Sequence, residues 1–161
     1  MYGVLDVAVS GMIAQRTRLD VITANIANSD AILDSTGKVN PYRRRAAFFA
    51  PGDPTAPTPE GRQLGVHVAE IRSNNGPPRL RHNPSSPYAY KDGPNAGYEP
   101  VPDVDLVMER VDEMAALRAY EASVVAAETT KTMLAQGLRL IASRHEDDAL
   151  PTVLIYGHGD V

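Results

Sequence analysis

Apolar residues near the N-terminus recur at intervals of three and four positions. They are Leu5, Ala8, Met12, Leu19, Ile22 and Ile26, with Gln15 as one polar member of the series. This spacing is typical of one face of an α-helix and matches a heptad stripe. The short polar side chains that crowd positions 25–30 compete for backbone hydrogen bonds and disfavour further helix. The pattern therefore predicts a helix over residues 5–27.

A second and longer stripe lies near the other end of the chain. It consists of Leu117, Tyr120, Val124, Ala127, Lys131, Leu134, Leu138 and Ile141. Either Asp103 or Asp105 can cap its start, where a carboxylate also favours the positive end of the helix dipole. The pattern predicts a helix over residues 106–142. This helix has more apolar surface than one partner needs, which is typical of helices buried by several neighbours.

The middle of the chain has a different character, because 12 of the 13 prolines lie between Pro41 and Pro102. Alternation from Leu64 to Ile71 predicts a strand, and Asn74-Asn75-Gly76 offers a turn into a returning strand at residues 79–82. Residues 46–50 form a further candidate strand. The proline-rich segment 51–59 is expected to be an exposed loop.

These patterns predict a mainly α fold. We expect two long terminal helices that lie antiparallel in a coiled-coil-like pair, with a small β-hairpin and loops between them. The chain divides into an N-terminal helix and loop (1–40), a proline-rich middle (41–102), a C-terminal helix (103–143) and an appended tail (144–161). The tail begins with charged residues and contains one short apolar run, Val153 to Tyr156.

Composition excludes several classes of function. The formal net charge of −4 gives no overall attraction for nucleic acid or for an anionic membrane. With no cysteine, the chain has neither disulfides nor thiolate chemistry. No stretch approaches the 18 or more apolar residues of a membrane span, and the N-terminus lacks the features of a cleaved signal peptide.

Candidate chemistry is also sparse. No GxSxG, GxGxxG or Walker motif occurs, and we expect no enzyme activity, no cofactor and no small-molecule substrate. Histidine and carboxylate residues do gather in the tail, at His145, Glu146, Asp147, Asp148, His158 and Asp160. Nothing in the sequence fixes their geometry, so we expect a solvated tail and no metal site. The basic run Arg43-Arg44-Arg45 is expected to be a solvated edge, or else to meet acidic residues of a neighbouring subunit.

Five short motifs occur in order over residues 1–142. They are Ala24-Asn25-Ile26-Ala27-Asn28 preceded by Leu19-Asp20-Val21, Pro41-Tyr42-Arg43-Arg44, Val101-Pro102-Asp103-Val104-Asp105, the segment from Met114 through Arg118 and Tyr120 to Ala122, and Lys131-Thr132-Met133 with Leu138-Arg139-Leu140. Together they resemble the flagellar rod and hook family of axial proteins, with its signatures AxNxANxxT, YRR, PNVD and AxRxYxAN. Asp103 and Ser123 stand where that family has Asn. The short middle is similar to that of proximal rod members, since distal rod and hook proteins have larger middles.

The resemblance implies a structural subunit of the flagellar basal-body rod. Such a subunit leaves the cytoplasm through the flagellar type III export apparatus without losing its N-terminus, and assembles with copies of itself and with other rod proteins to transmit torque. Composition alone favours the cytoplasm, whereas the resemblance implies the periplasmic rod. A soluble helical adaptor that binds one partner through a groove is the alternative.

Under the rod interpretation we expect the assembly interface to be formed by both terminal helices. The expected interface residues are Leu5, Met12, Leu19, Ile22, Asn25, Ile26 and Asn28 at the N-terminal end, and Arg118, Tyr120, Val124, Leu134, Leu138 and Ile141 at the C-terminal end.

Overall fold

The computed structural model describes residues 2–147. In chain order its elements are α1 (Tyr2–Ala27), β1 (Arg45–Pro51), α2 (Pro59–Leu64), β2 (Val66–Ser73), β3 (Arg79–His82), β4 (Tyr98–Val101) and α3 (Leu106–Asp147). Two long terminal helices and a small β middle are present, as the sequence predicts. About half of the described residues are helical.

The ends of the two long helices follow from local chemistry. At the end of α1, the side-chain amide of Asn28 donates a 2.8 Å hydrogen bond to the carbonyl oxygen of Ala24. At the start of α3, Asp105 Oδ1 accepts hydrogen bonds from the backbone N–H groups of Val107 (2.9 Å) and Met108 (3.3 Å). Asp105 is therefore the N-cap, and Asp103 is exposed in the segment that precedes it.

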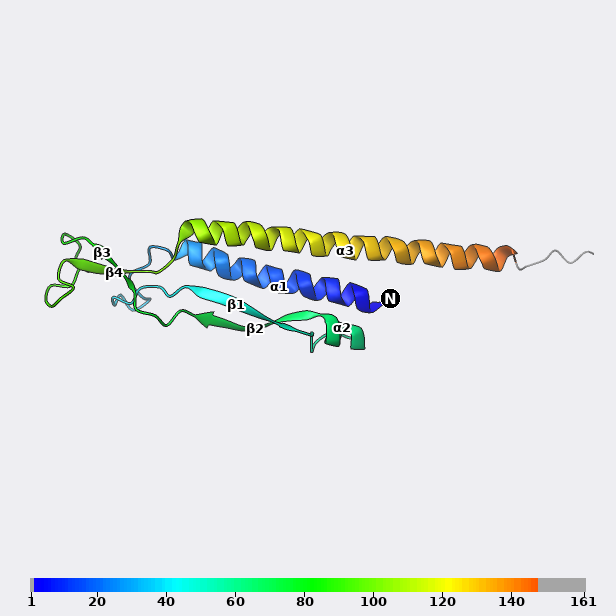
Figure 1. The fold of residues 1–161 in the computed structure, drawn as a ribbon, viewed down its shortest axis with the longest axis horizontal. Helices are drawn as coiled ribbons and strands as arrows, with labels where there is room; N and C mark the ends of the chain where they lie inside the picture. The colour runs from blue at the N-terminus through cyan, green and yellow to red at the C-terminus, as the bar shows by residue number, and fades with distance from the viewer. Residues whose placement is uncertain (1, 148–161) are drawn as a thin grey trace, which may run out of the picture.

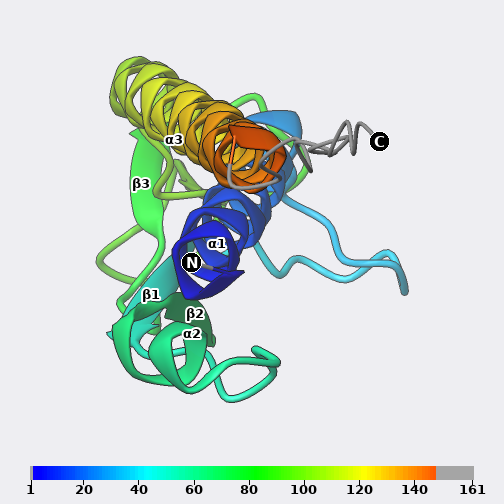
Figure 2. The same cartoon turned by 90° about the vertical axis from the view of Figure 1, so that its right-hand side faces the viewer.

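Helix α1 lies in the middle of a layered structure (Figures 1 and 2). On one side it runs beside α3, and on the other it contacts β1, β2 and α2. The two long helices approach closely, because a Cβ atom placed on Gly11 would lie 3.0 Å from Ser123 Oγ. The β3–β4 pair and its loops lie at the far end, next to the start of α3.

The strands form two separate pairs. β1 pairs antiparallel with β2, with a register shift between Phe48 and Phe49, and β3 pairs antiparallel with β4. The expected hairpin from residues 64–71 to 79–82 is therefore wrong in its pairing, although strands occur at both places. Pro77 and Pro78 follow the turn at once, and proline has no backbone N–H to donate to a returning ladder.

The expected exposed loop at residues 51–59 is also partly wrong. Gly52 and Ala56 are buried within it, and Pro59 begins α2. Thr58 caps this short helix by accepting a hydrogen bond from the N–H of Gly61 (3.1 Å), and its hydroxyl donates to Asp6 of α1 (2.5 Å). Proline fits there because the first N–H groups of a helix have no intrahelical partner. This segment thus attaches to the N-terminal half of α1.

The hydrophobic core of the described chain is small. Its buried apolar residues are Ala14, Val21, Ile22, Ala56, Val101, Val104 and Ala116. Three of the seven are alanines, so each contributes little buried area. None of the helices within residues 2–147 combines the length and apolar content needed to cross a membrane.

Candidate assembly interface

Asn25, near the end of α1, lies fully buried where three segments of the chain meet. Its Nδ2 group donates to the carbonyl oxygen of Arg45 (2.8 Å) and to Glu109 Oε2 (3.0 Å). Its Oδ1 atom accepts from the backbone N–H of Arg45 (2.9 Å) and from the Tyr42 hydroxyl (3.0 Å). All four hydrogen-bonding positions of the amide are thus used. Asn25 therefore joins α1, the start of β1 and the start of α3.

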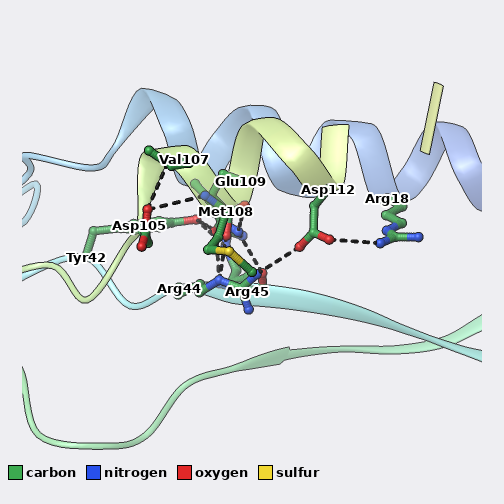
Figure 3. A network of polar contacts seen from close by, with 10 residues as sticks. Arg18, Tyr42, Arg44, Arg45, Asp105, Val107, Met108, Glu109 and Asp112 are labelled. Carbon is green, nitrogen blue, oxygen red and sulfur yellow. Dashed lines mark hydrogen bonds and ion pairs between the residues drawn. The ribbon is translucent and has the colours of Figure 1, made fainter. Parts of the chain in front are cut away.

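The buried carboxylate of Glu109 continues this network (Figure 3). Arg44 Nε donates to Glu109 Oε1 at 2.5 Å, and Arg44 Nη2 lies 3.4 Å from Asp112 Oδ2. Arg18 of α1 reaches the other oxygen of Asp112 at 3.3 Å. A buried carboxylate is costly unless it is paired and hydrogen-bonded, and here both oxygens of Glu109 have partners. We call this set of Arg18, Asn25, Tyr42, Arg44, Arg45, Glu109 and Asp112 the junction.

The antiparallel pair of β1 and β2 is called the β1–β2 arm. The junction connects this arm to the two long helices at one end of the molecule. Contacts at the other end of α1 act on the same arm. Ser10 Oγ accepts a 3.0 Å hydrogen bond from the N–H of Val66, at the start of β2. A Cβ atom on Gly61 would lie only 2.9 Å from Asp6 Cβ of α1, so α2 packs against α1 with almost no spare room. Helix α1 is thus fixed to the β1–β2 pair at two separated places, through Asn25 and Arg45 at one and through Ser10 and Val66 at the other.

Much of the apolar surface of α3 has no partner within the described chain. The exposed large apolar side chains on α3 are Leu106, Val107, Met108, Val111, Met114, Leu117, Val125, Met133, Leu138, Leu140 and Ile141. Leu138 and Leu140 are two positions apart and therefore point about 200° apart around a helix. The exposed apolar surface thus lies on more than one side of α3.

Helix α3 also extends beyond α1. With a rise of about 1.5 Å per residue, its 42 residues span about 63 Å and the 26 residues of α1 about 39 Å. Figure 1 shows the C-terminal part of α3 continuing past the N-terminus of α1. In that part Met133, Leu138, Leu140 and Ile141 are 66–71% exposed. We call residues 133–147 the α3 overhang.

The expected interface residues fall into three groups by burial. Ile22 and Asn25 are buried within the chain. Those that are half-buried are Leu5, Met12, Leu19, Ile26, Asn28, Tyr120, Val124 and Leu134. Arg118, Leu138 and Ile141 are exposed. The structure thus brings Asn25 into contacts within the subunit and leaves Leu138 and Ile141 mostly exposed among the described residues.

The expected interface left out several residues of this surface. Val107, Val111 and Met114 precede the predicted stripe in a different phase, and Met133 and Leu140 lie outside it. In the sequence, these residues differ from the rest of the helix only in being apolar. Because the helix has many other apolar residues, this property alone does not identify an interface.

The basic run is a solvated edge, as expected, at the exposed Arg43 and Arg45, but not at Arg44. Arg44 meets the acidic Glu109 and Asp112 of its own chain, whereas Arg43 donates to Asn75 and Arg45 lies over the Tyr42 ring. Glu109 and Asp112 lie 65 and 68 positions after Arg44. No pattern in the sequence around Arg44 indicates that it pairs with them.

Among the residues that the structure describes, no group of His, Asp and Glu side chains forms a metal site. The residues Asp148, His158 and Asp160 of the tail lie outside the described part. Among the residues whose burial the structure describes, the one buried carboxylate besides Glu109 is Glu99 of β4. Hydrogen bonds from Ser86 and Arg81 hold the pKa of Glu99 below its usual range, so this carboxylate stays ionised and supports the β3–β4 pair.

The chain matches known proteins in two ways, through a family sequence model and through individual relatives. Residues 5–31 match the sequence model of the family described as "Flagella basal body rod protein". The flagellar basal-body rod protein FlgC of Borreliella burgdorferi is 35% identical over 150 residues, which cover 88% of this chain and 97% of that relative. The FlgC proteins of Salmonella typhimurium and Escherichia coli O6:H1 are 33% and 34% identical over 144 residues, covering 87% of this chain and 97% of each relative.

Proposed function

The chain belongs to the FlgC family of flagellar basal-body rod proteins, and we propose that it is a rod subunit that assembles through its two terminal helices. Its neighbours in this proposal are copies of itself and other rod proteins. The proposal agrees with the non-enzymatic character expected from the sequence, since the relatives are rod proteins by name.

The observation that carries the proposal is the exposed apolar surface of α3. Val107, Leu140 and Ile141 are each at least 70% exposed, while the buried core is small. Contiguous apolar surface beyond a few hundred Å² is unusual on a soluble monomer and marks an interaction site. Because exposed apolar residues lie on more than one side of α3, several neighbours fit this surface better than the single partner of a groove-binding adaptor.

In this proposal the packing unit of the rod is an antiparallel pair formed by α1 and α3. Contacts between the helices support this direction, because Asn25 meets Glu109, Arg18 meets Asp112 and Gly11 approaches Ser123. Across these three pairs the residue number falls in α1 while it rises in α3, as expected for antiparallel helices. The junction then fixes the helix pair relative to the β1–β2 arm, so that the subunit can transmit torque as one body.

The same proposal includes a route and a location. We infer that the chain is exported by the flagellar type III apparatus without removal of a signal peptide, and that it works in the periplasmic rod. Membership of the FlgC family supports this inference.

A motility experiment tests the assembly proposal. Leu138 is 66% exposed in the free chain, so Leu138→Asp should alter the fold of the free subunit little. In an assembled rod the same carboxylate would lie in an apolar contact and would have to be desolvated without a partner, at a cost of about 3 kcal/mol or more. We expect cells carrying Leu138→Asp to express the protein and to be non-motile.

The matched control is Leu138→Met, which keeps the position apolar and close to its original volume. Cells with this variant should swim. Motile cells with Leu138→Asp would rule out burial of this position in the rod, provided that circular dichroism shows both purified variants to be equally helical.

A further inference from the structure

The turn that follows β2 contains a reactive pair of residues. Asn75 and Gly76 are both exposed, between the end of β2 at Ser73 and the prolines at positions 77 and 78. Asn75 is the only asparagine in the sequence that glycine follows. The backbone nitrogen of a glycine can attack the side-chain amide before it, because no Cβ atom hinders the approach and glycine adopts many backbone conformations. At this turn the chain can therefore react with itself.

The attacking nitrogen of Gly76 is available. Its N–H donates to Oδ1 of the Asn74 side chain at 2.9 Å, and both residues are exposed, so water can replace this hydrogen bond at little cost. Pro77 and Pro78 come next and have no N–H groups, so a β-ladder cannot continue through the turn. The nucleophile is thus not held in regular secondary structure.

Arg43 contacts the group that would be attacked. Its Nη1 group donates to Oδ1 of Asn75 at 3.2 Å. A charged donor draws electrons from the amide carbonyl and stabilises the negative oxygen that forms when a nucleophile adds to it. The guanidinium of Arg43 therefore lies where this charge develops. Arg43 precedes Asn75 by 32 positions, so no local pattern in the sequence indicates this donor.

We propose that Asn75 is a site of self-modification, at which the chain converts its own asparagine to aspartate and isoaspartate with Arg43 as the catalytic donor. The substrate is the side-chain amide of Asn75, the nucleophile is the Gly76 nitrogen, and the co-reactant is water. This chemistry goes beyond the proposed rod function and does not depend on it.

The reaction has two steps. Hydroxide removes the N–H proton of Gly76, and the nitrogen bonds to Cγ of Asn75 while Arg43 stabilises the oxyanion at Oδ1. The Cγ–Nδ2 bond then breaks, and Nδ2 leaves as ammonia after taking a proton from water, which regenerates the hydroxide. In the second step water opens the cyclic imide. Cleavage of its bond to Cγ gives aspartate, and cleavage of the original main-chain bond gives isoaspartate.

The other asparagines lack this combination of features. Asn40 and Asn83 precede proline, whose nitrogen has no proton to lose. Asn25 is buried and has all four hydrogen-bonding positions of its amide in use. The remaining three precede residues that carry a Cβ atom, which hinders the attack. We therefore expect the conversion of asparagine to be concentrated at Asn75.

Both products change the surface beside the junction. Each carries a new carboxylate next to Arg43, so a hydrogen bond to a neutral amide becomes an ion pair. Isoaspartate also adds one methylene group to the main chain. This addition lies directly after Asn74, whose N–H donates to the Arg44 carbonyl oxygen at 2.8 Å. The modification thus alters charge and main-chain length where the β1–β2 arm leads toward β3.

Mass spectrometry of the full chain tests the proposal. Trypsin releases the site as residues 73–79, because Arg72 and Arg79 flank it. The purified protein is held at neutral pH, and the modified fraction of this peptide is measured over time. We expect Arg43→Gln to slow the modification about fivefold, which is less than for a donor in a buried site because water surrounds Arg43.

Lys38→Gln is the matched control, because it removes the same charge from another exposed residue, and its rate should equal that of the wild-type chain. Circular dichroism should show both variants to be as helical as the wild-type chain. A rate for Arg43→Gln equal to or above the wild-type rate, or an equal slowing by Lys38→Gln, would overturn the role of Arg43.

A second variant tests the nucleophile. Gly76→Ala should slow the modification more than Arg43→Gln does, because the added methyl group hinders the attacking nitrogen. This Cβ atom would lie 3.1 Å from Oδ1 of Asn74, an exposed side chain that can move aside, so the variant should fold normally. Modification of Gly76→Ala at the wild-type rate would overturn the proposed reaction. Neither result bears on rod assembly, which the motility of Leu138→Asp cells reports.

Discussion

Asn25 illustrates how one short side chain can fix the relative positions of three distant segments. Its amide makes four hydrogen bonds, two with the backbone of Arg45 and one each with Tyr42 and Glu109. The sequence motif around Asn25 predicted its importance but assigned it to contacts between subunits. The structure places it inside the subunit, because its partners lie 17 to 84 positions away and no local pattern identifies them.

We predict that Asn25→Ala lowers the free energy of unfolding of the purified chain by about 2–4 kcal/mol. The substitution leaves the Arg45 backbone groups, the Tyr42 hydroxyl and one oxygen of the buried Glu109 without their partner. Urea unfolding followed by circular dichroism measures the change.

Asn28→Ala is the control within the same motif, since the Asn28 side chain makes a single bond to the Ala24 carbonyl oxygen at the helix end. That variant should lose about 1 kcal/mol or less. Equal losses for the two variants would show that the junction does not depend on Asn25.

The elements show what a periodic pattern can and cannot predict. Spacings of three and four predicted both long helices to within a few residues, yet the buried face of α1 differs from the predicted stripe. Among its most buried residues are Gly3, Ser10, Ala14, Val21 and Asn25, which also follow a heptad spacing but are mostly small or polar. Helix α1 packs closely between α3 on one side and the strands on the other. Close packing requires small side chains on the buried face, and a pattern of large apolar residues does not identify them.

Strand positions were likewise easier to predict than strand partners. Alternation identified the region of β2, and the turn residues suggested a local return. The actual partner of β2 is β1, which precedes it by about 20 positions and is separated from it by α2. Pairing over such a distance depends on tertiary contacts, here on the attachment of both strands to α1.

At the start of α3 the sequence offered two candidate caps, and the structure selects one. Asp105 accepts two backbone hydrogen bonds, so Asp105→Ala should lower the free energy of unfolding by about 1 kcal/mol. Asp103→Ala, the same change two positions earlier at an exposed residue, should change it by less than about 0.5 kcal/mol. Thermal unfolding of the two variants side by side measures both values. A larger loss for Asp103→Ala would mean that the cap is misassigned.

The whole molecule combines a small core with long, largely exposed helices. The apolar core of the described chain consists of only seven buried residues, while Val107, Leu138 and Leu140 of α3 are 66–71% exposed. The motifs in the sequence predicted the family correctly, because short signatures in a fixed order identify relatives without any knowledge of packing. They could not predict which faces of α3 are left uncovered, since that depends on where α1 ends and how the arm attaches to it.

The central claim is that neighbouring subunits cover the exposed apolar surface of α3 in the rod. Cryo-electron microscopy of isolated basal bodies, at a resolution that shows side chains, tests it most directly. The account predicts that this chain lies in the rod with Leu138 and Ile141 packed against the α1 or α3 helix of another subunit. A rod in which this chain is present but its α3 overhang faces solvent, or a rod without this chain, would contradict the account.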